Sequence, residues 1–185
     1  MEQLEIFGIL LARPEKPLVF LTQFAISLFV FGIIVRRLAL PWLDGLNART
    51  AMTILLLPHA FRHIGLSFLV PGLVADDMPW FFSVTAGYGD LLSAMLAIVA
   101  LVALQGRWSI ALPVIWLFTI VGIADLVNAL RQAEAVLYFQ SSWYIPTFIV
   151  PLLLTTHAMI IARLVKRAPA LKTELGTRTR AGQGA

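Results

Sequence analysis

The chain has 185 residues, of which 59% are hydrophobic and only 13% are charged, and its mean hydropathy is +0.87. A soluble domain is about a quarter charged and less than half apolar. The composition therefore excludes an ordinary soluble enzyme or binding module and indicates an integral membrane protein. No cysteine is present, which excludes disulfides, thiolate metal ligands and cysteine catalysis.

Five continuous apolar runs follow one another along the chain, each long enough for the roughly 20 residues of a membrane-spanning helix. They cover residues 17–35, 51–75, 80–104, 109–130 and 143–165. We therefore predict an all-α, polytopic integral membrane bundle of five transmembrane helices, forming one domain over residues 1–167. Residues 168–185 are polar and basic, and we expect them to form a disordered cytoplasmic tail.

The net charge of +4 is explained by the position of the basic residues, so the lipid bilayer and not nucleic acid is the expected partner. With five spans, ten basic residues fall on one side and three on the other. The first group is Arg36, Arg37, Arg49, Arg107, Arg163, Lys166, Arg167, Lys172, Arg178 and Arg180, and the second is Arg13, Lys16 and Arg131. Because basic flanks stay cytoplasmic, we expect the N-terminus outside and the C-terminus inside a bacterial inner membrane, with homo-oligomerisation left open.

Polar residues interrupt the second apolar run, which contains the sequence "LPHAFRHIGLSFL". His59, Arg62 and His63 are spaced i, i+3 and i+4, so on an α-helix they share one face. Leu57, Phe61, Ile64 and Phe68 fall on the opposite face, which suits lipid or apolar packing. We therefore expect the three polar side chains to point into the bundle.

Four further polar residues lie in other runs: Asp90 in the third, Asp125 and Asn128 in the fourth, and His157 in the fifth. Counted at about 1.5 Å per residue from the cytoplasmic ends, His59 and His157 lie roughly 12 Å deep and Asp90 roughly 21 Å deep. Asp125 and Asn128 lie about 24 Å deep or more and form a satellite towards the outer side. These residues, with Arg62 and His63, predict one buried polar centre.

The third run places small residues on one helical face around Asp90, and we expect this face to pack closely against other helices. Its members are Ser83, Ala86, Gly87, Ser93, Ala94 and Ala97. The two glycines of "AGYGDLL" (86–92) are interpreted as packing residues, since no phosphate-binding or dinucleotide motif occurs. An unpaired charge at the bilayer centre costs at least about 2.5 kcal/mol, so we predict that Arg62 and Asp90 pair.

One interpretation of the polar centre is a zinc-like metal site, with His59, His63 and His157 as ligands and Asp90 as a fourth ligand or a partner of one. Three histidines and an aspartate are similar in ligand type to the set of intramembrane zinc hydrolases of the ceramidase type, although the number of spans and the order of motifs differ. The resemblance would imply an intramembrane hydrolase. A haem held between His59 or His63 and His157 is the related alternative, and would imply a redox protein.

Our leading interpretation is proton-linked transport or binding of a small solute or ion, with no cofactor. Histidine titrates near neutral pH, and buried histidine, aspartate and arginine mark ion and substrate routes in membranes. Adding a divalent ion beside Arg62 would place extra positive charge in a medium of low dielectric constant, whereas a proton-linked site needs no such ion. The sequence leaves open whether the protein is an enzyme and which solute it would handle.

Overall fold

A computed structural model describes residues 15–181, so residues 1–14 of the expected domain and residues 182–185 of the tail lie outside the described part. Five helical segments are long and apolar enough to span a membrane. They are Glu15–Asp44, Ala48–Leu69, Trp80–Gln105, Ala111–Arg131 and Ser141–Arg167. The prediction of an all-α bundle with five such helices is confirmed, and the chain is a multi-pass membrane protein.

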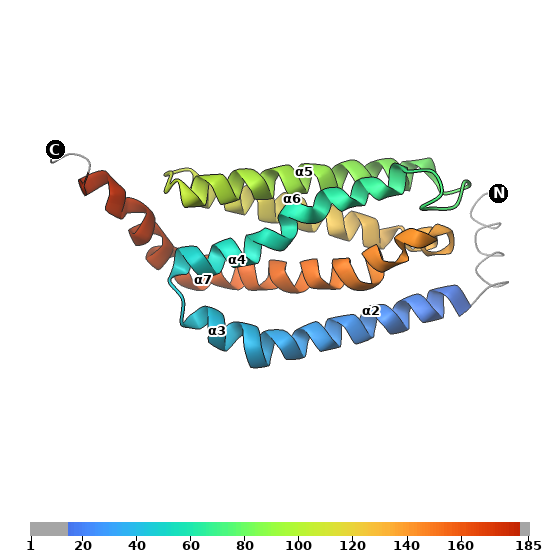
Figure 1. The fold of residues 1–185 in the computed structure, drawn as a ribbon, viewed down its shortest axis with the longest axis horizontal. Helices are drawn as coiled ribbons and strands as arrows, with labels where there is room; N and C mark the ends of the chain where they lie inside the picture. Colours follow the sequence, from blue (N-terminus) through green and yellow to red (C-terminus); the bar gives the residue numbers. More distant parts are fainter. Residues whose placement is uncertain (1–14, 182–185) are drawn as a thin grey trace.

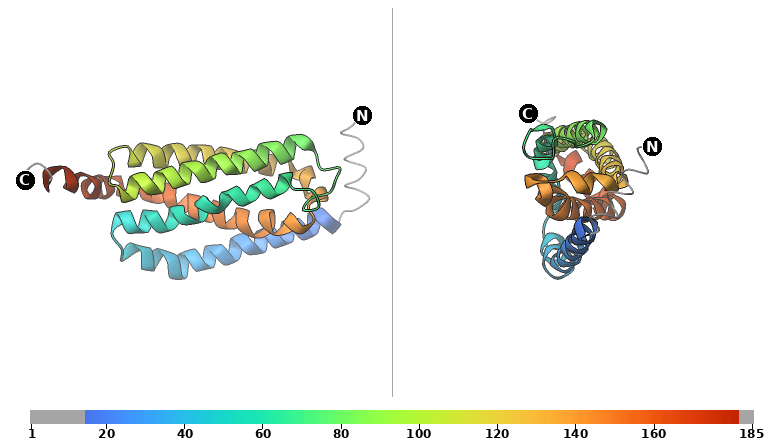
Figure 2. Two further views of the ribbon diagram at one scale, coloured as in Figure 1. Left: turned by 45° about the horizontal axis from the view of Figure 1, so that its top comes forward. Right: turned by 90° about the vertical axis from the view of Figure 1, so that its right-hand side faces the viewer.

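The helices run side by side along the long axis of the molecule (Figure 1). Seen end-on, α4, α5, α6 and α7 form a ring, and α2 lies outside it against one side (Figure 2). We call one end the basic end, where residues 44–48, 105–110 and 163–167 lie, and the other the loop end, formed by residues 70–79 and 132–142. The polar residues of interest lie between these ends.

The first span is longer than the sequence predicted. Helix α2 (Glu15–Ile34) continues through one π turn, η1 (Val35–Ala39), into α3 (Leu40–Asp44). Arg36 and Arg37 were expected to close this span but lie inside a continuous helix, because the next helix-breaking signals are Pro41 and Gly45. The π turn, in which the Leu40 N–H donates to the Val35 carbonyl, precedes Pro41, whose ring does not fit a regular helix interior.

The second span changes its helical geometry in the middle. Helix α4 (Ala48–Ala60) starts at Asn47, whose side chain accepts a hydrogen bond of 2.8 Å from the Thr50 N–H. From Phe61 to Leu69 the chain forms a 3-10 helix, η2, whose buried residues are Arg62, Gly65 and Phe68. This spacing of three is the period of a 3-10 helix, which turns about 120° per residue instead of about 100°.

Helix α5 (Trp80–Gln105) packs closely against both of its neighbours, α4–η2 and α6 (Ala111–Arg131). The six small residues predicted to line its packing face are all buried. Small side chains let helix backbones approach closely, so this face brings α5 near enough for short polar contacts between helices.

The last span begins with short irregular segments and ends far beyond the membrane-spanning stretch. The segments η3 (Ala133–Tyr138), η4 (Ser141–Trp143) and η5 (Ile145–Ile149) lead into α7 (Val150–Ala181). The structure thus places residues 168–181 in a helix, where the sequence led us to expect a disordered tail. Leu171 and Leu175 are buried against other helices, and the Glu174 carboxylate accepts hydrogen bonds of 2.9 and 3.0 Å from the Ala48 and Arg49 N–H groups.

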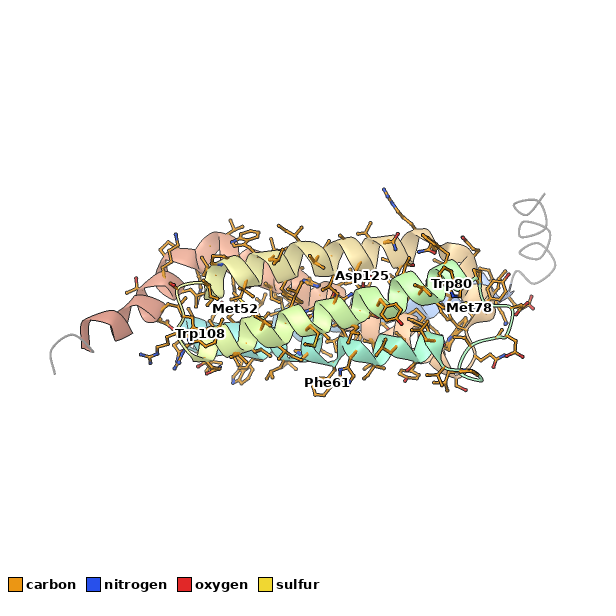
Figure 3. All side chains as sticks on the ribbon, turned by 90° about the horizontal axis from the view of Figure 1, so that it is seen from above. Met52, Phe61, Met78, Trp80, Trp108 and Asp125 are labelled. Carbon is orange, nitrogen blue, oxygen red and sulfur yellow. The ribbon has the colours of Figure 1, made fainter. Side chains whose placement is uncertain are left out.

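Two apolar cores fill the bundle, one towards each end. The basic-end core contains residues of α4, α5, α6 and α7, among them Leu56, Ala97, Ile115 and Ile160. The loop-end core contains Phe68, Phe82, Val136 and Phe139, among others. The polar centre lies between them, and Asp125 is seen there between α5 and α6 in Figure 3.

Candidate functional site

The centre of the site is Arg62, whose side chain is buried and makes three polar contacts. Its Nε donates to Asp90 Oδ1 at 2.7 Å, its Nη2 to Asp125 Oδ2 at 2.5 Å, and its Nη1 to the Gly122 carbonyl at 3.1 Å. The predicted pair between Arg62 and Asp90 is confirmed. Asp125, expected as a more distant satellite, is a direct partner, because the forked guanidinium reaches one carboxylate on each of two helices. We call Arg62, Asp90 and Asp125 the charged triad.

The charged triad does not balance its own charge. One guanidinium faces two carboxylates, whose side chains are only 14% and 10% exposed. With both carboxylates ionised, the triad carries one net negative charge in an apolar bundle. Because isolated charge is costly in such surroundings, a bound proton or a cation is needed to neutralise it.

Three glycines make room for these side chains. A Cβ atom at Gly65 would overlap with the carboxylate of Asp90, and one at Gly89 would overlap with the carboxylate of Asp125. At Gly122 it would lie 2.8 Å from His157 Nε2 and 2.9 Å from Arg62 Nη1. Real Cβ atoms do not approach other atoms so closely, so the three positions have to be glycine for the site to keep its geometry.

His59 and His157 lie next to each other on the basic-end side of Arg62, and we call them the histidine pair. Their ring centroids are 4.2 Å apart, and the ring of Phe118 contacts both, at 5.0 Å and 5.1 Å. Both histidines are buried, with 0% and 2% of their surface exposed. The expectation that residues 59 and 157 meet at the same depth is confirmed.

Hydrogen bonding of the histidine pair is incomplete. His59 Nε2 lies 3.0 Å from the hydroxyl of Thr156, which itself donates to the Leu152 carbonyl at 2.9 Å. Within the described residues, no protein group bonds His59 Nδ1 or either ring nitrogen of His157. Buried polar atoms normally have partners, so these nitrogens are suited to transient contacts with water, a proton or a small polar ligand.

Two of the predicted site residues lie elsewhere. The expectation that His63 points into the bundle is wrong, because its side chain is exposed and its Nδ1 lies 3.0 Å from the Ala60 carbonyl. The cause is the 3-10 geometry from Phe61 onward, which carries His63 about a quarter turn away from the face of His59. The same change buries Phe68, which was expected on the outer face. Asn128 is also exposed, on the surface of α6.

The proposed metal and haem ligands can be compared with this geometry. His63 points away from the histidine pair, and Asp90 is held by Arg62. Among residues 15–181, no group of three or more histidine, aspartate or glutamate side chains is arranged to hold a metal ion. The axial histidines of a haem lie on its opposite faces, whereas the rings of His59 and His157 contact each other directly. The residues present therefore do not fit either group.

A cavity of about 70 Å³ lies between the charged triad and the loop end. Asp90 and Asp125 form part of its wall, together with apolar residues of α5, α6 and the connection between α6 and α7. This cavity could not be predicted from the apolar runs, since it forms where the connection at residues 133–139 folds back onto the bundle and buries Val136 and Phe139. The arrangement gives the two carboxylates a route towards one end of the molecule.

Comparison with known proteins adds a family to this description but no activity. No curated protein and no solved structure matches the chain. A family described as "Domain of unknown function (DUF8737)" matches residues 19–165, which include all five spans in whole or in large part and every residue of the site. The chain, a multi-span helical membrane protein with a buried arginine and two buried histidines, therefore belongs to the DUF8737 family of proteins.

Proposed function

We propose that this protein binds or transports a small solute or ion in exchange for, or together with, a proton, and that the charged triad is the site of proton exchange. The observation that carries the proposal is the pairing of one buried arginine with two carboxylates. Such a site alternates between two neutral states, one with a proton on a carboxylate and one with a cation beside it. Buried ionisable groups of this kind mark ion and proton routes in membrane proteins.

The histidine pair supports the same proposal. Gly122 borders both Arg62 and His157, so the triad and the pair are adjacent and not separate features. The unbonded nitrogens of the pair are able to accept a proton or to bind water. They extend the polar centre towards the basic end, where the basic-end core closes the bundle.

The direction of the route follows from the distribution of basic residues. Arg49, Arg107 and Arg167 lie at the ends of spans or between them, near the basic end, so this end faces the cytoplasm under the rule for basic flanks. The loop end and the cavity then face the outside, which is the periplasm if the protein resides in a bacterial inner membrane. In this arrangement a solute reaches the charged triad from the outside through the cavity, and the basic-end core blocks the way to the cytoplasm.

Proton exchange at the triad is tested by infrared spectroscopy of the protein in lipid nanodiscs during a pH titration. The wild type is expected to gain a protonated-carboxyl band on acidification. Asp90→Asn and Asp125→Asn each should remove or shift this band, because each removes one of the two carboxylates. A band that is missing from the wild type at every pH, or that is unchanged in both variants, would contradict the proposal.

Coupling to transport is tested with the protein in liposomes that contain a pH-sensitive dye. With small cations present on both sides of the membrane, an imposed pH gradient should drive proton movement that the Asp125→Asn and His157→Gln variants lose. His63→Gln is the matched control, since it changes a histidine of the same segment that lies on the outer surface. If the charged triad only held helices together, the variants would lose stability and the wild type would move no protons.

A further inference from the structure

The cavity beside the charged triad points to the chemical class of the solute. We infer that it takes a small organic ammonium cation, of the size of methylammonium to tetramethylammonium, in exchange for the proton. This inference rests on the proposed function and adds the identity of the ligand class. The charge, walls, size and access of the cavity all fit such a ligand.

The charge facing the cavity is negative. Asp90 and Asp125 line the cavity, but Arg62, which neutralises one of them, does not. The guanidinium thus lies behind the carboxylates, with its three donor nitrogens directed at them and at the Gly122 carbonyl. A ligand in the cavity meets carboxylate oxygens with one uncompensated charge, and a cation is the complementary ligand.

The walls favour an organic cation over a metal ion. Apart from the two aspartates, Gln132 is the only polar residue in the lining among residues 15–181. Hard cations need about six or more oxygen ligands, which this lining does not supply. The rings of Phe68, Phe82 and Phe139 line the cavity and contact one another with centroids 5.4 to 5.7 Å apart. Aromatic surfaces of this kind bind quaternary and substituted ammonium groups through their electron-rich faces.

The volume limits the size of the ligand. The cavity measures about 70 Å³, and one water-sized group needs roughly 10–15 Å³ of such space. The cavity therefore holds a ligand of about five to seven non-hydrogen atoms. Tetramethylammonium is within this limit, and longer alkyl chains would have to project out of the cavity.

Access is from the loop end. Leu130 and Gln132, at the C-terminal end of α6, line the cavity and are exposed and half-buried, respectively. The covering segment η3 is held by hydrogen bonds from Lys16 Nζ to the Leu137 carbonyl at 2.8 Å and from the Ala75 N–H to the Tyr138 carbonyl at 2.9 Å. A ligand that reaches the carboxylates passes Gln132 and the edge of this segment.

Exchange follows from the charge of the triad. A carboxyl group of the triad releases its proton as the ammonium ion arrives, and the net charge of the site stays at zero. Binding of one cation therefore releases one proton. A neutral molecule of the same shape releases no proton, because it forms no ion pair with a carboxylate of the triad.

The experiment is calorimetric titration of the full-length protein in lipid nanodiscs with tetramethylammonium chloride, tert-butanol and sodium chloride. Tetramethylammonium and tert-butanol have the same number of non-hydrogen atoms but differ in charge. Repeating each titration in buffers of different ionisation enthalpy counts the protons released. We expect tetramethylammonium to bind with release of about one proton, and tert-butanol and sodium to bind at least tenfold more weakly.

Two variants connect the binding to the cavity. Ala86→Leu fills the cavity beside Asp90 and should weaken tetramethylammonium binding at least tenfold, while the infrared carboxyl titration persists. Phe82→Leu keeps an apolar wall but removes one aromatic face, and should weaken binding severalfold even if Ala86→Leu fails to fold. Val84→Leu is the matched control, because Val84 lies on the same helix but does not line the cavity.

The outcomes separate the two proposals. A normal carboxyl titration without ammonium binding would overturn the ligand class and leave the proposed function standing. Equal binding of tert-butanol, or binding of sodium alone, would also overturn it. Ammonium binding without proton release would contradict the exchange, and no carboxyl titration at all would contradict the proposed function itself.

Discussion

The two apolar cores differ in how completely they are filled. In the basic-end core, Ala97, Ala100 and Ala103 of α5 are fully buried against other helices, as is Ile115 of α6. In the loop-end core, large aromatic rings meet around a cavity that reaches the charged triad. Small residues let helices close together, whereas bulky rings between more widely separated segments leave a gap. The cavity therefore connects the charged triad with the loop-end core, on the side where the aromatic rings lie.

The largest effect should come from removing the positive charge of Arg62, which lies between the two cores. Arg62→Met leaves Asp90 and Asp125 buried without their partner, and loss of one member of a buried ion pair costs about 3–5 kcal/mol. We expect the variant to lose most of its folded fraction in thermal unfolding in detergent. Adding Asp90→Asn and Asp125→Asn should recover much of it, because no buried charge then remains unpaired. A single variant as stable as the wild type would show that the triad is not essential to the fold.

A pair of substitutions on one helix tests the difference in packing. Ala97→Leu adds three carbon atoms to the filled basic-end core and should cost about 1–3 kcal/mol through overpacking. Ala86→Leu adds the same atoms next to the cavity and should cost less than about 1 kcal/mol. Unfolding midpoints in detergent provide the measurement. Equal losses would mean that the two cores are packed alike.

The glycines around the polar centre provide a smaller test. Gly122→Ala brings a Cβ atom against Arg62 and His157, and we expect a loss of about 1–2 kcal/mol, in the lower part of the range for overpacking. Gly32→Ala in α2 is the control, since nothing lies within 4 Å of its added carbon. That variant should be neutral or gain up to about 1 kcal/mol from helix propensity. Similar losses in both variants would remove the case for close packing at Gly122.

Much of this architecture could be predicted from the sequence. Hydropathy alone predicted five spans, and the spacing of small residues predicted the face of α5 that packs. The cost of an unpaired charge predicted that Arg62 bonds Asp90. These features depend on composition and on regular helical geometry, and both can be read from one chain.

The errors share a physical origin, which is departure from regular helix. His63 was assigned by α-helical spacing, but the 3-10 turn beginning at Phe61 rotates it outward. The reach of Arg62 to Asp125 depends on the side-chain length of arginine and not on helix register. The sequence does carry one further signal, because the glycines that make room for the site, Gly65, Gly89 and Gly122, lie within three residues of Arg62, Asp90 and Asp125, respectively.

The segment beyond the last span was also misinterpreted, for a different reason. Its charge and glycine content resemble those of disordered chains, but Leu171 and Leu175 are spaced i, i+4 and lie on one helical face. That face packs onto the basic-end core, which therefore extends past the membrane-spanning stretch. The loop-end core has no corresponding extension among the described residues.

This extension predicts the smallest of the effects considered. The Glu174 carboxylate accepts hydrogen bonds from the first N–H groups of α4, where negative charge is favourable because of the helix dipole. Glu174→Gln keeps one acceptor oxygen but removes the charge, so we expect a loss of about 0.5–1 kcal/mol. Amide hydrogen exchange at Ala48 and Arg49 should become about two- to fivefold faster for a change of this size, with no change at the loop end. Lys172→Gln, at an exposed position of the same segment, should leave these amides unaffected. If both variants accelerated exchange equally, general charge in this segment, and not a specific cap from Glu174, would hold it against α4.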